Sequence, residues 1–169
     1  MGNSTIGCFD IPLSAFPIPV ILRAMKTVIL YYSRSGNTKA LALKKALELD
    51  ADIEEIVEEK KPLLVVGLYR ALRRKKTAIR PIKALLDSFD KIIIMSPVWA
   101  AHPVSAINSV IECLPGGKKV ELFMVSAGGG TRESVEKTKA LITARACEVA
   151  GYTDVHVKRK GSEVLSQKL

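Results

Sequence analysis

The sequence is poor in the features that define several large classes of protein. Its three cysteines, Cys8, Cys113 and Cys147, lie far apart and form no CxxC motif or Cys/His cluster, which excludes a disulfide scaffold and a zinc site of the usual spacing. No apolar run approaches the roughly 18–20 residues of a membrane-spanning helix. Aromatic residues make up 5% of the chain and hardly interleave with the basic ones, so nucleic-acid recognition by base stacking lacks support. We therefore expect a cytoplasmic protein with reduced thiols and with neither a membrane nor a nucleic acid as partner.

Acidic residues are also few, 17 against 26 basic ones, which gives a net charge of +9. Most of the excess lies between Glu58 and Lys83, where nine basic residues and two acidic ones leave a charge of +7. We call residues 60–83 the basic segment. A local positive patch indicates association with something anionic and says nothing of the fold. The alternative is a solvated surface that aids solubility.

The remaining composition is that of one globular domain. The chain has 169 residues, of which 48% are hydrophobic and 25% charged, close to the averages for soluble domains. Residues 1–25 differ from the rest, because three prolines disfavour a helix and no basic residue precedes Arg23. Two explanations stay open: translation begins at Met25, or residues 1–25 are an amino-terminal extension whose apolar residues 11–22 pack on the domain or across a dimer interface. The domain itself is expected to span 26–169.

From residue 27 onward, strand and helix patterns alternate. The predicted strands span 27–32, 53–57, 91–95, 120–125 and 155–157. The predicted helices span 38–49, 62–86 with divisions at Gly67 and Pro81, 104–114, and 132–150 with an end at Gly151, and the tail after Gly161 allows two helical turns. This alternation predicts an α/β domain with a five-stranded parallel sheet between helices, and a ligand site beyond the carboxyl ends of the strands.

The loop after the first strand combines hydroxyls, a glycine and a helix start. Its residues are Ser33, Arg34, Ser35, Gly36, Asn37 and Thr38. Backbone N–H groups and the dipole at a helix N-terminus favour an anion such as phosphate, although an ordinary N-cap has the same composition. Neither GxGxxG nor GxxxxGK[ST] occurs, so a dinucleotide or nucleoside triphosphate site is not indicated.

Two further loops follow the third and fourth strands. Residues 96–103 include the one tryptophan, Trp99, in a loop bounded by prolines, where it could cover a planar ring. Residues 126–131 hold three glycines, which let the backbone approach a flat ligand closely. A packing role for the tryptophan and a flexible turn for the glycines are the alternatives.

Together the three loops resemble the flavodoxin-like family, and the subgroup that carries a Pro-Val-Trp loop, over roughly residues 26–158. The resemblance implies a three-layer doubly wound sandwich with strand order 2-1-3-4-5 and non-covalently bound FMN. It implies that Ser33, Ser35, Gly36, Asn37 and Thr38 hold the phosphate while Arg34 offsets its charge. It also implies that the isoalloxazine ring is lined by Pro97, Val98, Trp99 and Ala100, and that its pyrimidine edge meets Ser126, Ala127, Gly128, Gly129 and Gly130. His102 lies near this site, whereas His156 is expected to be structural.

The function implied is electron transfer through FMN. A NAD(P)H-dependent FMN or quinone reductase is the alternative, and a cofactor-free binding or regulatory protein on the same fold is a further one. We expect a redox partner, acidic if it docks on the basic segment, and leave a homodimer open. The chain departs from the family in its basic charge and in Met95, which stands where glycine is common and could crowd the strand end.

Overall fold

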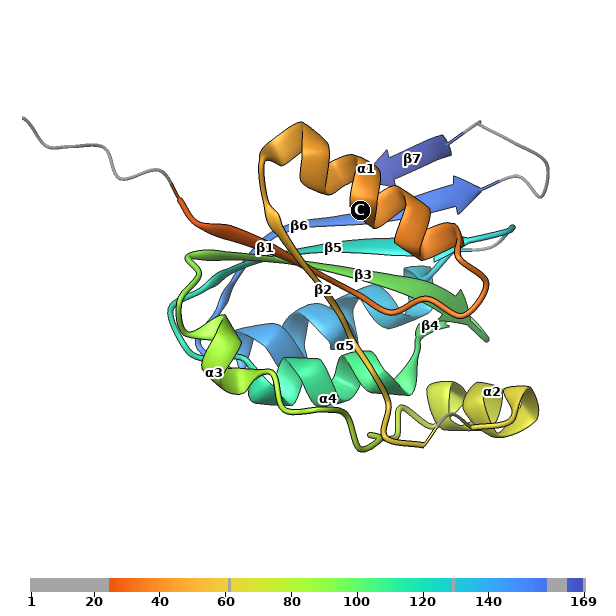
Figure 1. The fold of residues 1–169 in the computed structure, drawn as a ribbon. Helices are drawn as coiled ribbons and strands as arrows, with labels where there is room; N and C mark the ends of the chain where they lie inside the picture. The colour runs from red at the N-terminus through yellow and green to blue at the C-terminus, as the bar shows by residue number, and fades with distance from the viewer. Residues whose placement is uncertain (1–24, 61, 129, 158–163, 169) are drawn as a thin grey trace, which may run out of the picture.

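The computed structural model describes residues 25–60, 62–128, 130–157 and 164–168. The predicted packing of residues 11–22 and the position of Gly129 therefore lie outside the described residues. The strands of the sheet (Figure 1) are β1 (Thr27–Tyr31), β2 (Asp52–Glu55), β3 (Lys91–Trp99), β4 (His102–Pro103), β5 (Lys119–Ser126), β6 (Glu148–Val157) and β7 (Val164–Lys168).

The five parallel strands lie in the order β2-β1-β3-β5-β6, which confirms the predicted order 2-1-3-4-5. Two antiparallel strands add to this sheet, since β7 pairs with β6 and β4 pairs with the end of β3. The prediction of a helix in the tail after Gly161 was wrong, because residues 164–168 form β7 instead.

The helices are α1 (Asn37–Leu49), α2 (Leu64–Leu72), α3 (Lys83–Leu86), α4 (Ser105–Cys113) and α5 (Arg132–Thr143). The expected division at Gly67 was wrong, since this glycine lies inside α2 and the chain leaves the helix after Leu72. Arg74 then adopts a left-handed conformation with φ of 49°, and an extended stretch follows up to α3.

The last predicted helix is also shorter than expected, because α5 ends at Thr143 and β6 takes up residues 148–157. Ala146, with φ of 55°, turns the chain out of the helix. Gly151 is therefore not a helix cap but a residue of β6, where the pairing with β5 shifts register. A Cβ at Gly151 would lie 3.3 Å from Cγ of Glu121, so the glycine relieves crowding at this irregularity.

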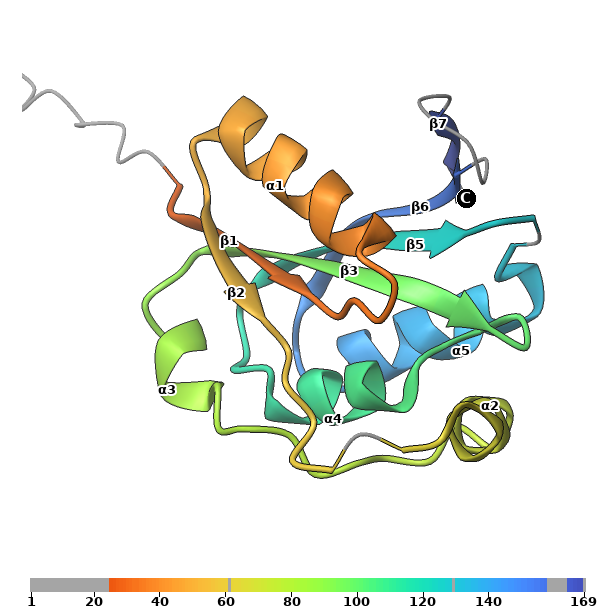
Figure 2. The same ribbon diagram turned by 45° about the vertical axis from the view of Figure 1, so that its right-hand side comes forward.

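The helices lie on both sides of the sheet (Figures 1 and 2). α1 covers one face, α3, α4 and α5 cover the other, and α2 stands at an outer corner beside the end of β3. Alternation along β1 sends Val28 and Leu30 into the core under α4 and α5 and Ile29 and Tyr31 into the core under α1. In the described part of the chain, no helix is both long and apolar enough to cross a membrane.

Candidate functional site

Three loops meet at the carboxyl edge of the sheet, because β1, β3 and β5 are neighbours in register. Tyr31 pairs with Met95, and Pro97 pairs with Val125. We call them the β1 loop (residues 32–36), the β3 hairpin (residues 97–103) and the β5 loop (residues 126–131). The structure therefore brings the three predicted binding segments to one edge.

The β1 loop ends in an open helix N-terminus. Gly36 adopts a left-handed conformation with φ of 91°, and its N–H donates to Oγ of Ser33 at 3.1 Å. No side chain accepts a hydrogen bond at the N-cap of α1. Ser35 and Asn37 are exposed, whereas Thr38 is buried with 3% of its surface exposed. The backbone N–H groups of the first turn of α1 therefore point toward the carboxyl edge of the sheet, where an anion would accept hydrogen bonds from them.

The β3 hairpin turns through two non-glycine residues in the left-handed region. Ala100 has φ of 49° and Ala101 has φ of 60°, and alanine in this region costs about 1–2 kcal/mol. Buried Ser96 holds the base of the hairpin, since its hydroxyl donates to the carbonyl of Pro97 at 2.9 Å and accepts the N–H of Val104 at 3.4 Å. These two hydrogen bonds of Ser96 hold the hairpin in one conformation.

Trp99 contacts residues of two other segments. The Arg34 guanidinium lies 5.7 Å from its ring centroid, and the Tyr32 ring meets it edge-on at 6.2 Å. A Cβ on Gly67 of α2 would lie 2.4 Å from the tryptophan ring, so only glycine allows α2 to approach this closely. Trp99 therefore links the β1 loop, the β3 hairpin and α2, and its predicted contact with a flavin ring stays a prediction.

The β5 loop is held to β6 by a buried carboxylate. Asp154 accepts the N–H of Thr131 at 2.9 Å and its hydroxyl at 2.6 Å, and the Tyr152 hydroxyl donates to Thr131 Oγ1 at 2.9 Å. A Cβ on Gly130 would lie 2.7 Å from Asp154 Oδ2. Burial raises the pKa of Tyr152 to about 12, which keeps its hydroxyl protonated as a donor. The loop is therefore fixed at its carboxyl end.

The remaining described residues of this loop face outward. Ala127 and Gly128 are exposed, and Ser126 Oγ lies 3.1 Å from Nδ1 of His156. This contact is consistent with the structural role that the sequence suggested for His156. A small cavity of about 220 Å³ lies beside it and is lined by Ala101, Gly130, Arg132, Glu133, Asp154 and His156.

His102 lies on β4 and is partly buried. Its Nδ1 atom is buried without a hydrogen-bond partner among the described residues. Burial lowers the pKa of His102, and the nearby positive charge of Arg74 lowers it further. The imidazole is thus kept neutral, so His102 brings no positive charge to the carboxyl edge of the sheet.

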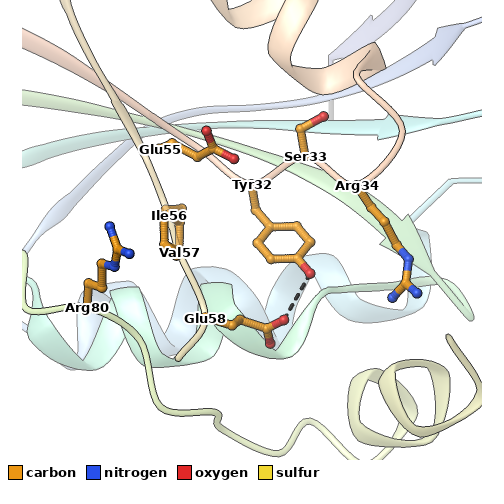
Figure 3. A pocket seen from close by; sticks show the side chains of 8 residues that line it. All are labelled: Tyr32, Ser33, Arg34, Glu55, Ile56, Val57, Glu58 and Arg80. Atoms are coloured by element: carbon orange, nitrogen blue, oxygen red, sulfur yellow. Dashed lines mark hydrogen bonds between the residues drawn. The ribbon is translucent and has the colours of Figure 1, made fainter. Parts of the chain in front are cut away.

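A larger cavity of about 410 Å³ opens between the ends of β1 and β2 (Figure 3). It is lined by Tyr32, Ser33, Arg34, Glu55, Ile56, Val57, Glu58 and Arg80. Inside it the Tyr32 hydroxyl donates to Glu58 Oε2 at 2.9 Å, and burial together with this bond raises the pKa of Tyr32. Because Ser33 and Arg34 line it, the cavity adjoins the predicted phosphate site.

Sequence reasoning missed three residues that shape this edge: Tyr32, Glu58 and Asp154. A signal existed for the two acids, since Glu58 follows a predicted strand directly and Asp154 precedes an apolar one. Carboxylates at such positions are buried only when they are hydrogen-bonded. The Met95 side chain, by contrast, is buried in the core under α1 and does not crowd the edge.

In the described segments, no group of three or more His, Cys, Asp or Glu side chains could hold a metal ion.

The chain matches no protein-family model and no curated protein sequence. Its structure is similar to solved ones. A flavoprotein from Lactobacillus acidophilus NCFM, solved in complex with FMN, has 26% identity and a TM-score of 0.63, with 78% of this chain and 93% of that chain covered.

Two further solved structures share the fold at lower identity. A provisionally assigned flavoprotein from Bacteroides uniformis ATCC 8492 has 21% identity and a TM-score of 0.64, with 80% of this chain and 94% of that chain covered. A protein from P. pentosaceus described as an NADPH-quinone reductase has 12% identity and a TM-score of 0.54, with 79% and 85% covered. The chain therefore has the flavodoxin-like fold that its loops resembled.

Proposed function

We propose that this flavodoxin-like chain binds FMN at the carboxyl edge of its sheet and serves in electron transfer. The observation that carries the proposal is the open N-terminus of α1 behind Gly36, with φ of 91° and no side-chain cap. It is supported by the Lactobacillus acidophilus flavoprotein, similar over 78% of this chain, which was solved in complex with FMN. When bound, FMN supplies the one- and two-electron chemistry, and the protein supplies binding and orientation.

The phosphate group would accept hydrogen bonds from the first turn of α1. The exposed side chains of Ser35 and Asn37 add donors, whereas the buried Thr38 would contribute chiefly its backbone N–H. The Arg34 side chain adds positive charge at the same place, and its Nη1 atom donates to the Pro62 carbonyl at 3.1 Å. This donor set fits a phosphate dianion.

The ring would lie between the β3 hairpin and the β5 loop. Pro97, Val98 and Ala100 on one side and the exposed backbone of 127–128 on the other could contact it. Their support is rigid, because Ser96 holds the hairpin and Asp154 holds the β5 loop. A preformed site avoids the entropy of ordering these loops when the ligand binds.

The phosphate assignment is tested by comparing FMN with riboflavin. Ser35→Ala is expected to weaken FMN binding by about 1.5–3 kcal/mol, the value of a hydrogen bond to a charged group, and to leave riboflavin binding unchanged. Ser88→Ala is the matched control, since its hydroxyl bonds the Leu85 carbonyl far from this edge. Equal loss of both ligands in Ser35→Ala would contradict the assignment, and wild-type protein that binds neither flavin would contradict the function.

Electron transfer is separated from the reductase alternative by incubation with NAD(P)H alone. A carrier leaves NAD(P)H unoxidised until a reductase is added, and steady turnover by the purified holoprotein would support the enzyme. The carrier role is supported by the basic segment, which lies beside the edge and offers exposed charges to an anionic partner. A cytoplasmic location remains part of the proposal and is consistent with the free thiols of Cys113 and Cys147.

One residue of the basic segment has a different role from the one expected. Arg74 is half-buried, and its Nη2 atom donates to Thr138 Oγ1 at 3.2 Å on α5. Burial lowers the pKa of Arg74. This side chain therefore joins the segment to the domain, whereas Lys60, Arg73, Lys75, Arg80 and Lys83 are exposed.

A further inference from the structure

In helix α2 the smallest residues are buried and the largest apolar residues are exposed. Its two buried residues are Gly67 and Ala71. Its apolar residues, together with Leu63 at the N-cap, are exposed: Leu63, Leu64, Val65, Val66, Leu68, Tyr69 and Leu72. Val65 is 76% exposed, Leu72 56% and Tyr69 50%. A surface helix of a globular protein has the opposite arrangement.

The orientation of α2 is determined by the contact of Gly67 with Trp99. Because a Cβ at this position would lie 2.4 Å from the tryptophan ring, the helix can pack this closely only through a face without a side chain. Turning α2 to bury its leucines and valines would break that contact. The apolar residues are thus held outward, and an exposed apolar patch of this kind marks an interaction site.

Positive charge borders the apolar face. Arg73, Lys75 and Lys76 follow directly on α2 and are exposed, and Lys60 is exposed on the preceding stretch. Arg73 and Lys75 lie 5.8 Å and 5.6 Å from the Tyr69 ring centroid. Lys76 pairs with Glu112 at 2.5 Å. Most of these charges remain available to an anionic partner.

The arrangement favours a lipid surface over other occupants. A second copy of the chain paired through α2 would bring two basic segments together across a two-fold axis, and like charges oppose this. A protein partner would need an apolar groove with an acidic rim, whereas α2 stands out at a corner of the molecule in both views (Figures 1 and 2). A protruding apolar helix with a tyrosine and basic neighbours suits the headgroup boundary of a bilayer.

We propose that α2 and its basic neighbours bind the surface of an anionic lipid bilayer. The apolar face would enter the boundary between headgroups and acyl chains, and Arg73, Lys75 and Lys60 would meet anionic headgroups. The inference does not depend on FMN binding. It runs against the expectation drawn from the sequence, which was that the protein has no membrane as partner.

Sedimentation of the full chain with vesicles tests the apolar contact. The wild type is expected to bind vesicles of phosphatidylcholine and phosphatidylglycerol at 3:1 and to bind pure phosphatidylcholine at least tenfold more weakly. Val65→Glu with Leu72→Glu should reduce binding to the anionic vesicles at least tenfold. Leu47→Glu is the control, because Leu47 is 87% exposed on α1, and it should bind as the wild type does.

The basic neighbours are tested by neutralisation. Arg73→Gln with Lys75→Gln should weaken binding about 30-fold, since each basic residue near an anionic surface contributes about 1 kcal/mol. Lys39→Gln with Lys44→Gln removes two exposed charges from α1 instead and should have little effect. Binding should also weaken as salt rises from 0.05 to about 0.5 M, as the Debye length shortens.

Several outcomes would overturn the proposal. These are a wild type that stays in the supernatant, equal binding to neutral and anionic vesicles, and α2 variants that bind like the wild type. A concentration-dependent increase in size that the α2 variants abolish would assign the face to self-association. Trp99 emission, which should shift on vesicle addition because its ring contacts α2, checks the site directly. FMN affinity should be unchanged in every α2 variant, which separates this test from that of the proposed function.

Discussion

The two faces of the sheet have cores of very different size. Among the described residues, the core under α4 and α5 has 22 buried members, whereas the core under α1 has six. A groove of about 210 Å³ remains beside α1, lined in part by Leu41, Met95, Phe123 and Val155. The difference follows from the chain path, because the next described element after β6 is the edge strand β7 and not a helix that would cover this face. We infer that most of the stability comes from the face under α4 and α5.

Residues 11–22 are the candidate to cover the smaller core. The sequence predicted that these residues pack on the domain or across a dimer interface, and the groove beside α1 offers a partly apolar surface for the first of these. The extension itself lies outside the described residues, so its packing stays a prediction.

The largest expected effect is on the free energy of unfolding when one leucine is truncated on each face of the sheet. Leu122→Ala empties a fully buried site under α4 and α5 and should lower the free energy of unfolding by about 2–5 kcal/mol. Leu41→Ala, on the partly buried side of α1, should cost about 1–2 kcal/mol. Urea denaturation of both variants measures the difference. Equal losses would show that the two faces contribute alike.

An intermediate effect on stability is expected when Tyr31 or Tyr32, at the end of β1, is replaced by phenylalanine. Tyr32→Phe leaves the buried Glu58 carboxylate without its donor and should cost about 1–3 kcal/mol. Tyr31→Phe removes a 3.2 Å bond to the exposed Glu55 and should change stability by less than about 0.5 kcal/mol. Thermal or urea unfolding at pH 7 compares them, and a larger loss in Tyr31→Phe would reverse the comparison.

Tyr32 should also impose an alkaline limit on stability. Burial and the bond to Glu58 raise the pKa of Tyr32 in the folded state above its ordinary value of 10.0, so unfolded protein loses this proton first. The stabilisation is therefore complete below about pH 10 and declines as pH rises through the folded pKa. Tyr32→Phe should show a smaller decline of the unfolding free energy than the wild type, and the remaining decline comes from Tyr31 and Tyr152, whose pKa values are also raised.

The smallest effect concerns His102, at the end of the β3 hairpin. Its pKa is lowered from 6.5 by burial and by Arg74, with Lys137 adding to this and Glu133 opposing it. The unfolded chain takes up the proton first, so stability falls as pH drops below about 6.5 and the loss is complete below the folded pKa. Unfolding free energies at pH 7.5 and 5.5 should differ less in His102→Asn than in the wild type. An identical difference would show that another group dominates.

Much of this fold could be predicted because its signals are local. The runs TVILYY and KIIIM indicate buried strands without reference to any partner, and the breaks after them place the loops. The errors lie where contacts distant in sequence decide the structure. The sequence predicted a helix up to residue 150 and a strand only over 155–157, whereas pairing with β5 makes all of Glu148–Val157 a strand. Pairing with β6 did the same for residues 164–168.

The sequence by itself determined that the loops after the strands lie at the carboxyl edge, since the parallel sense follows from the alternation of strand and helix. The order of the strands was implied only by the resemblance to the flavodoxin-like family. It could not determine what each loop contacts there. The enclosure of Trp99 by Arg34 and Gly67, and the anchoring of Thr131 by Asp154, join residues 23 or more positions apart. Such contacts depend on the distance and direction between side chains, which only the packed tertiary structure decides.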